Sequence, residues 1–255
     1  MNPKISQWQG CRVWVIGAST GIGAETAKIL LARGANVVLS ARRQEALEAL
    51  SQGHPNALPL ALDITNHASV LRARDAVLAR WRGLDLVLVV AGGYSEMRAD
   101  DFDLAAANQL VDLNLRGVLN CLDAVLPTLL TQNHGGLGIV SSVAGYSGLP
   151  RALIYGPTKA ALINLCESLF LDLRPRGIGV YLINPGFVET PLTADNAFPM
   201  PALISAAEAG YQIVRGIERG DFHIHFPRRF TNCLRFARLL PYRLYFWLVH
   251  KVTGL

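Results

Sequence analysis

The sequence predicts an α/β fold: a single doubly wound, mostly parallel sheet of about seven strands with helices on both faces. Short apolar stretches suited to buried strands alternate with longer amphipathic stretches suited to helices. The first apolar stretch runs directly into a glycine-rich loop that opens a helix. A chain of 255 residues can bury one large core, and the alternation leaves no gap for a second domain. We therefore expect one domain over residues 1–227, followed by a basic amphipathic helical extension over residues 228–255 that is not an independent domain.

The glycine-rich loop lies between an expected strand at 12–16 and an expected helix at 24–33. Gly17 allows a sharp turn, and Gly21 and Gly23 permit a close approach of the backbone. The free N–H groups and the dipole at the start of a helix favour a pyrophosphate. The pattern predicts a dinucleotide site made by Gly17, Ser19, Thr20, Gly21, Ile22 and Gly23.

The other expected elements follow in order along the chain. Further strands are expected at 36–40, 57–62 and 84–90, at a stretch ending at 139–142, and at 178–183 and 222–226; further helices are expected at 44–50, 104–131 and 153–173. The last helix must begin near residue 153, because Pro157 is tolerated only in a first turn. Residues 191–204 form no clear element and are expected to be a mobile substrate loop.

Tyr155 and Lys159 are four residues apart, so they share one face of the expected helix 153–173. An ordinary tyrosine, with a pKa of about 10, exchanges protons poorly at neutral pH. A nearby ammonium and the positive end of the helix dipole would both lower this pKa. A surface pair of no function is the alternative for this spacing alone. Ser142, at the end of the preceding strand, could bring a hydroxyl to the same place.

Taken together, these motifs make the chain similar to members of the short-chain dehydrogenase/reductase family. Members of this family are NAD(P)-dependent oxidoreductases built on a Rossmann sheet. The resemblance covers residues 10–226 and rests on motifs in the family's order. These are the glycine loop, Asp63, Ala91-Gly92, Asn114, Ser142, Tyr155 with Lys159, and the stretch from Asn184 to Thr190.

The end of the second strand is where this family selects its cofactor. NAD-preferring enzymes place a carboxylate there to bind the ribose hydroxyls. This chain has Ser40-Ala41-Arg42-Arg43 instead. We expect the cofactor to be NADP, with NAD less favoured. Arg42 is expected to bind the 2′-phosphate, and Arg43 is expected to assist it. Arg43 could instead belong only to the polar face of helix 44–50.

The resemblance assigns further cofactor contacts. Asp63, followed by Ile64, stands where the family's aspartate binds the adenine amino group. Its alternative role is to cap the next helix, but Thr65 and Asn66 are better caps. The remaining implied contacts, around the nicotinamide and its ribose, are Ala91, Gly92, Tyr155, Lys159, Pro185, Gly186, Val188 and Thr190.

The resemblance also implies four catalytic roles. Tyr155 gives or takes the proton, and Ser142 hydrogen-bonds the carbonyl oxygen. Lys159 binds the ribose hydroxyls and lowers the pKa of the tyrosine. Asn114, at a local bend of helix 104–131, holds a water beside the lysine. This chemistry needs no metal.

The expected function is therefore the NADP-dependent interconversion of a carbonyl and an alcohol on a small, hydrophobic substrate. Two alternatives are a non-catalytic NADP-binding regulator and a membrane-surface scaffold. A homo-oligomer, dimer or tetramer, is also expected, through the helices around Asn114 and Tyr155, with Leu162, Leu165 and Leu169 as outer apolar positions.

Charge and cysteine usage bear on compartment and partners. No Cys-x-x-Cys or Cys/His cluster suits zinc, and the N-terminal stretch has no continuous apolar run. We expect the four cysteines to be buried free thiols and the protein to be cytoplasmic. The net charge of +5 comes from the tail, which has no acidic residue after Asp221, so no nucleic-acid partner is expected. The basic tail residues are Arg228, Arg229, Arg235, Arg238, Arg243 and Lys251.

The tail places Phe230, Cys233, Leu234 and Ala237 on one helical face before Pro241 breaks the pattern. Its arginines interrupt every stretch of about 20 apolar residues needed to span a bilayer. Two roles stay open: peripheral contact with the inner face of a membrane, or a lid that packs over an apolar pocket.

Overall fold

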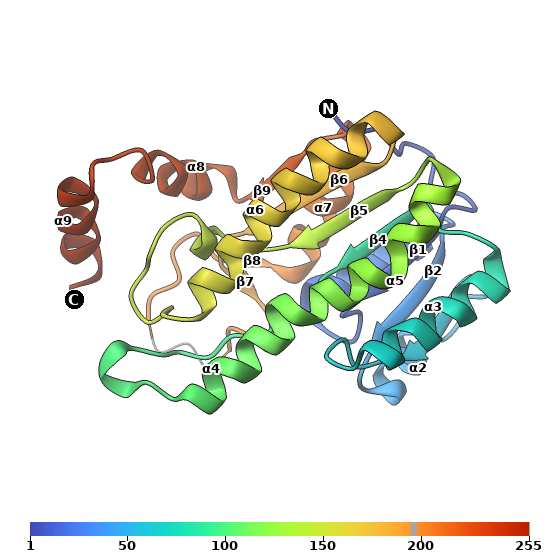
Figure 1. Ribbon diagram of the computed structural model, residues 1–255, viewed down its shortest axis with the longest axis horizontal. Coiled ribbons are helices and arrows are strands. Elements are labelled where there is room, and N and C mark those ends of the chain that lie inside the picture. Colours follow the sequence, from blue (N-terminus) through green and yellow to red (C-terminus); the bar gives the residue numbers. More distant parts are fainter. Residues whose placement is uncertain (195–197, 255) are drawn as a thin grey trace.

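The computed structural model describes residues 1–194 and 198–254, and its core is one seven-stranded sheet. Every strand pairing in this sheet is parallel, in the order β3-β2-β1-β4-β5-β6-β9 (Figure 1). The predicted fold class is confirmed. The strands are β1 (Arg12–Ile16), β2 (Asn36–Ala41), β3 (Ala57–Ala61), β4 (Leu86–Val89), β5 (Gly136–Val140), β6 (Gly179–Pro185) and β9 (His223–Phe226).

Helices cover both faces of the sheet because successive strand residues point to opposite sides. The helices are α1 (Gly21–Ala32), α2 (Gln44–Ser51), α3 (His67–Trp81), α4 (Leu104–Val111), α5 (Gly117–Gln132), α6 (Tyr155–Leu173), α7 (Ala206–Arg219), α8 (Arg228–Ala237) and α9 (Tyr242–Thr253). Trp14 and Ile16 of β1 pack against α3, α5 and α6, whereas Val13 and Val15 pack against α1, α2 and α7.

The strand order reverses direction between β1 and β4. The chain moves outward from β1 to β3 on one side and from β4 to β9 on the other, so the loops after β1 and β4 diverge. A crevice forms at the carboxyl ends of the strands at such a point, and ligands of doubly wound sheets bind there. The topology therefore places the site where the glycine loop leaves β1.

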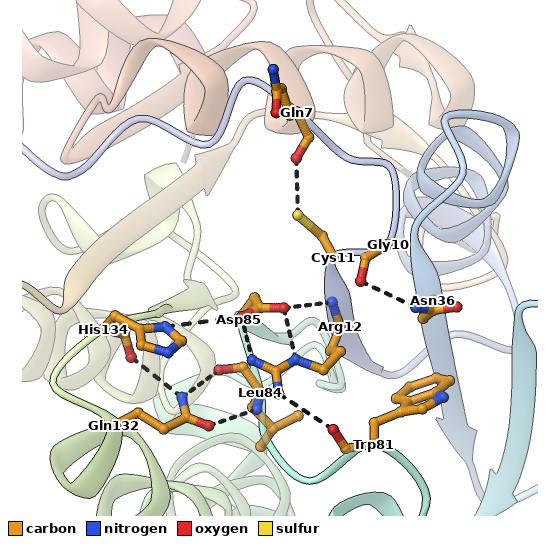
Figure 2. A network of polar contacts seen from close by, with 10 residues as sticks. All are labelled: Gln7, Gly10, Cys11, Arg12, Asn36, Trp81, Leu84, Asp85, Gln132 and His134. Atoms are coloured by element: carbon orange, nitrogen blue, oxygen red, sulfur yellow. Dashed lines mark hydrogen bonds and ion pairs between the residues drawn. The ribbon is translucent and has the colours of Figure 1, made fainter.

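The opposite, amino-terminal end of β1 and β4 is held by a polar network (Figure 2). The Arg12 guanidinium donates to both carboxylate oxygens of Asp85, at 2.9 and 2.7 Å. Burial acts to raise the pKa of Asp85, but the hydrogen bonds from Arg12 hold it below its ordinary value. The Gln132 side chain pairs with both backbone groups of Leu84, at 3.0 and 2.7 Å. These contacts stabilise the sheet at the end away from the crevice.

The first residues of the chain are fastened to the far part of the sheet. The side-chain amide of Asn2 donates to the Val180 carbonyl at 2.6 Å and accepts from the Val180 N–H at 2.9 Å. Its backbone N–H donates to the Gly220 carbonyl at 3.1 Å. Asn2 is 7% exposed, so its side chain acts as a short strand partner for the start of β6.

Three expectations about the elements need correction. The substrate loop is partly regular, because β7 (Val188–Glu189) pairs with β8 (Ile204–Ser205), although residues 195–197 of the expected loop lie outside the described residues. Helix 104–131 is divided by a π-helical segment, Asp112–Arg116. Leu162 is not an outer position: it is fully buried in its own subunit, since its face of α6 covers the sheet.

The helical segment Leu104–Gln132 is long and apolar enough to cross a membrane, judged by length and composition alone. Here it belongs to the α/β layer structure, since α5 packs against α3 and against β4. Its buried residues, among them Val118, Cys121 and Val125, are part of the core on one face of the sheet. We treat it as a core helix.

Candidate active site

The glycine loop is shaped by close backbone contacts. A Cβ atom at Gly17 would lie 2.5 Å from the Ala91 nitrogen, and one at Gly23 would lie 2.1 Å from the Gly17 carbonyl oxygen. Larger residues would push the loop away from β4 and from α1. Thr20 precedes α1 without a side-chain cap, so no capping side chain takes the first N–H groups of this helix. They remain suited to an anion.

A cavity of about 660 Å³ lies at the carboxyl ends of the strands. It brings together every residue predicted to contact the cofactor. These residues are Gly17, Ser19, Thr20, Gly21, Ile22, Gly23, Arg42, Arg43, Asp63, Ile64, Ala91, Gly92, Tyr155, Lys159, Pro185, Gly186, Val188 and Thr190.

The walls of this cavity fit a dinucleotide. A Cβ atom at Gly92 would lie 3.3 Å from both Asn114 Oδ1 and Lys159 Nζ. One at Gly21 would lie 2.9 Å from Thr190 Cγ2. A larger residue at Gly92 or Gly21 would therefore crowd Lys159 or Thr190, which also line the cavity.

The end of the cavity beside β2 carries positive charge. Arg42 and Arg43 are exposed and line it at the end of β2. The Asp63 carboxylate accepts from the N–H and the hydroxyl of Thr65, at 2.9 and 2.8 Å. Asn66, and not Asp63, caps α3, because its side chain accepts from the Ser69 N–H. The alternative role of Asp63 as that cap is thereby excluded.

Ser142, Tyr155 and Lys159 meet on one wall of the cavity. Tyr155 is the first residue of α6, so Pro157 lies in the first turn as predicted. The Lys159 ammonium lies 5.7 Å from the centre of the Tyr155 ring. Burial raises the pKa of Tyr155, and a hydrogen bond with Ser142 opposes that rise.

The expectation that Lys159 lowers the pKa of Tyr155 is wrong for this structure. Lys159 is 4% exposed, and burial lowers its own pKa to about 8. Its ammonium donates to the Val140 carbonyl at 3.1 Å instead of to the phenol. Burial disfavours the charged form of each group, and this effect on the two pKa values outweighs the effect of the short distance between them.

Two contacts fix the position of Lys159. The Ser141 hydroxyl donates to the Lys159 carbonyl at 2.7 Å, which ties the end of β5 to the first turns of α6. A Cβ atom at Gly145 would lie 2.7 Å from the Lys159 carbonyl carbon. Because Gly145 has no side chain, the loop after Ser142 can lie directly on α6.

Asn114 is fully buried in the π-helical segment and does not line the cavity. Its side chain accepts from the Gly93 N–H at 2.8 Å and donates to the Gly93 carbonyl at 3.0 Å. It also donates to the Thr158 hydroxyl at 3.2 Å, next to Lys159. The side chain thus joins the loop after β4 to α6, and the predicted water-holding role of Asn114 stays a prediction.

Sequence reasoning missed several residues of this site. Gly93, Leu113, Ser141, Leu192 and Thr193 also line the cavity. Gly93 directly follows Ala91-Gly92, so adjacency could have indicated it. Tyr94 packs edge-on against Tyr155 with ring centres 5.1 Å apart, and no sequence spacing indicates such a contact.

Comparison with known proteins agrees with this geometry. Residues 12–198 match the family described as short chain dehydrogenase. The chain belongs to the short-chain dehydrogenase family. Its members bind NAD(P)(H), and the protein is an oxidoreductase of this family. Two relatives of similar sequence are named as oxidoreductases. An uncharacterized oxidoreductase of Myxococcus xanthus is 37% identical over 235 residues, which cover 91% of this chain and 93% of the relative. An uncharacterized oxidoreductase of Staphylococcus epidermidis is 33% identical over 185 residues, which cover 72% of this chain and 80% of the relative.

Solved structures place this short-chain dehydrogenase on the same fold. A short-chain dehydrogenase from Streptomyces avermitilis superposes with a TM-score of 0.81 at 24% identity, covering 96% of this chain and 98% of that one. A ribose-5-phosphate isomerase from Brucella melitensis 16M superposes with a TM-score of 0.79 at 27% identity, covering 86% of this chain and 92% of that one.

Proposed function

We propose that the protein is an NADP-dependent oxidoreductase that interconverts a carbonyl and an alcohol on a small hydrophobic substrate. The observation that carries this proposal is the meeting of Ser142, Tyr155 and Lys159 on one wall of the cavity that begins at the glycine loop. These three groups could polarise a carbonyl and move one proton. An isomerase of sugar phosphates finds no comparable support among the described contacts.

The proposed roles follow from the groups themselves. The Ser142 hydroxyl and the Tyr155 phenol are hydrogen-bonded neighbours, so both can donate to one carbonyl oxygen. Tyr155 delivers the proton in reduction and accepts it in oxidation. Lys159, beside the tyrosine, would bind the hydroxyls of the nicotinamide ribose. Asn114 would link this lysine to solvent through a water on its carbonyl.

The cofactor contacts are the cavity-lining residues named above. When bound there, the nicotinamide supplies hydride transfer at its C4 carbon. The N-terminus of α1 would hold the pyrophosphate, and Asp63 would bind the adenine amino group. Pro185, Gly186, Val188 and Thr190 would hold the nicotinamide end.

We expect Arg42→Ala to weaken NADPH binding by about 10- to 100-fold and to leave NADH binding unchanged, because a charged hydrogen bond to phosphate is lost. Cofactor fluorescence titration measures both affinities. Arg80→Ala removes an exposed arginine on α3 and is the matched control. An equal loss for NADH would show that Arg42 does not select for the 2′-phosphate.

A hydrophobic substrate is supported by two leucines that line the cavity and by an aromatic cluster that begins at Phe187, next to the cavity-lining Gly186. Leu113 and Leu192 line the cavity. The Phe187 ring, on the loop after β6, lies 6.0 Å from that of Phe198 and 5.7 Å from that of Phe230. NADPH consumption with a panel of short carbonyls, retinoids, steroids and long-chain aldehydes tests this class. A folded protein that binds NADPH and reduces none of them would favour the non-catalytic regulator.

We also propose a homo-oligomer that forms through α5 and α6. Leu119 and Leu130 on α5 and Leu171 on α6 are exposed apolar side chains, at 45%, 37% and 73% exposure. The molar mass measured by light scattering should be that of a dimer or tetramer. Leu171→Arg should lower this mass toward that of a monomer. Tyr211→Arg, on α7, is the control. A wild-type monomer across a wide concentration range would contradict this proposal.

A cytoplasmic location is the remaining proposal. The four cysteines are free, which suits a reducing compartment. Cys121 and Cys166 are buried, and burial raises the pKa of each to about 12. The expectation of buried thiols does not hold for Cys233, which is exposed on α8, or for Cys11, which is only partly buried.

A further inference from the structure

The C-terminal helices α8 and α9 carry an unusual amount of exposed apolar surface. Figure 1 shows α9 standing away from the sheet at one end of the molecule. Trp247 is 55% exposed, Phe246 60% and Tyr242 79%. We define the tail surface as the exposed side chains of Phe236, Leu239, Tyr242, Leu244, Phe246, Trp247 and Val252.

The tail is held to its own subunit by other residues. The Tyr245 hydroxyl donates to the Gly148 carbonyl at 2.7 Å. The Phe230 ring packs on Phe187 and on Gly186, where a Cβ atom would lie 3.1 Å from it. These contacts are those expected of a lid on the cavity rim. They leave the tail surface uncovered, so packing on the subunit does not explain it.

The charge around the tail surface is of one sign. Residues 222–255 contain six arginines and lysines and no aspartate or glutamate. Within the described part of the chain, Arg238, Arg243 and Lys251 form no ion pair with a carboxylate. The Lys251 ammonium lies 5.0 Å from the centre of the Trp247 ring, so cation and aromatic face share one surface.

This chemistry discriminates between possible occupants. A second copy docked through the same surface would bring two sets of cations together with no acidic partner on either tail. An anionic lipid surface supplies the missing negative charge and accepts aromatic and aliphatic side chains at the depth of the headgroups. The helices have 10 and 12 residues, well short of the about 20 needed to cross the apolar core of a bilayer.

We propose that the tail surface lies on an anionic lipid bilayer, with Trp247, Phe246 and their apolar neighbours inserted at the interface and Arg238, Arg243 and Lys251 among the headgroups. Because Phe230 anchors the tail on Gly186, which lines the cavity, binding would bring the rim of the cavity to the lipid surface. An apolar substrate could then enter from the bilayer.

The test is co-flotation of the full-length protein with vesicles of phosphatidylglycerol and, separately, of phosphatidylcholine. We expect strong binding to phosphatidylglycerol, weak binding to phosphatidylcholine, and loss of the difference at about 1 M salt, where charges are screened within about 3 Å. Arg238→Gln with Arg243→Gln should weaken binding by about 25-fold, since each cation near an anionic surface contributes about fivefold. Trp247→Ser should weaken it by about tenfold.

Matched variants separate this site from general attraction of a basic protein. Arg72→Gln with Arg80→Gln removes the same charge from exposed positions on α3, and Tyr211→Ser removes an exposed aromatic from α7. Neither should change binding by more than about twofold. Three results would overturn the proposal: no flotation of folded wild-type protein, equal losses in the tail and control variants, or tail-dependent self-association without lipid binding. An unchanged thermal melt shows that each variant is folded.

Discussion

Tyr155→Phe is expected to lower turnover by about 10³-fold while NADPH binding stays within about twofold of wild type. The substitution removes one hydroxyl and keeps the ring that Tyr94 packs against edge-on. The Ser142 hydroxyl would remain to orient a carbonyl, so the loss isolates the proton transfer. Because burial raises the pKa of Tyr155, the protonated phenol is the resting form at neutral pH. Reduction should therefore be supported at neutral pH.

Single-turnover reduction, followed through the absorbance of NADPH, measures this effect. Tyr94→Phe is the matched control, since Tyr94 is half-buried, contacts the same ring and does not line the cavity. Its turnover should fall by no more than about fivefold. If Tyr155→Phe retained near-normal turnover, another group would have to carry the proton and the proposed mechanism would be wrong.

Lys159→Met is expected to lower turnover by about 10²- to 10³-fold and also to weaken NADPH binding by at least tenfold. This ammonium is proposed to bind the ribose hydroxyls and so to hold the nicotinamide beside Tyr155, so both quantities should fall together. Methionine keeps most of the side-chain volume, which limits the cost of an internal cavity. Lys28→Met, at an exposed position on α1, is the control.

The same variant has a distinct pH signature in the protein without cofactor. Burial lowers the pKa of Lys159 from 10.5 to about 8. Below pH 8 the lysine is charged in both the folded and unfolded states, and its desolvation penalises folding in full. Between about pH 8 and 10.5 the folded state loses the proton first, so this penalty declines. The stability of wild type relative to Lys159→Met should rise over that range in chemical denaturation. A flat difference would mean that Lys159 is not desolvated.

Local patterns accounted for most of the fold and for the composition of the cavity. The glycine loop and the first-turn position of Pro157 follow from rules that act within a few residues, and the structure has both. The parallel, doubly wound sheet follows from the βα alternation. Tyr155 and Lys159 face the cavity because a spacing of four residues keeps them on one helical face.

What the sequence could not give depends on contacts between distant segments. The direction of the pKa shifts of Tyr155 and Lys159 is set by how much water the folded protein removes, which no spacing encodes. Leu162 belongs to an apolar stripe that could face either the sheet or a partner. The Asn114 side chain joins Gly93 to Thr158, two segments that meet only in the folded chain. The β7–β8 pairing within the substrate loop is of the same kind.

The anchoring of Asn2 has a consequence for the order in which the chain matures on the ribosome. Its partners, Val180 and Gly220, are made about 180 and 220 residues later, so the first segment must wait undocked while most of the sheet is synthesised. The strands β1 to β5 can assemble from neighbouring βα units in the meantime, because their contacts are closer in sequence. Docking of Asn2 is then a late, long-range step of folding. It can take place only after β6 and the end of α7 have reached their final positions.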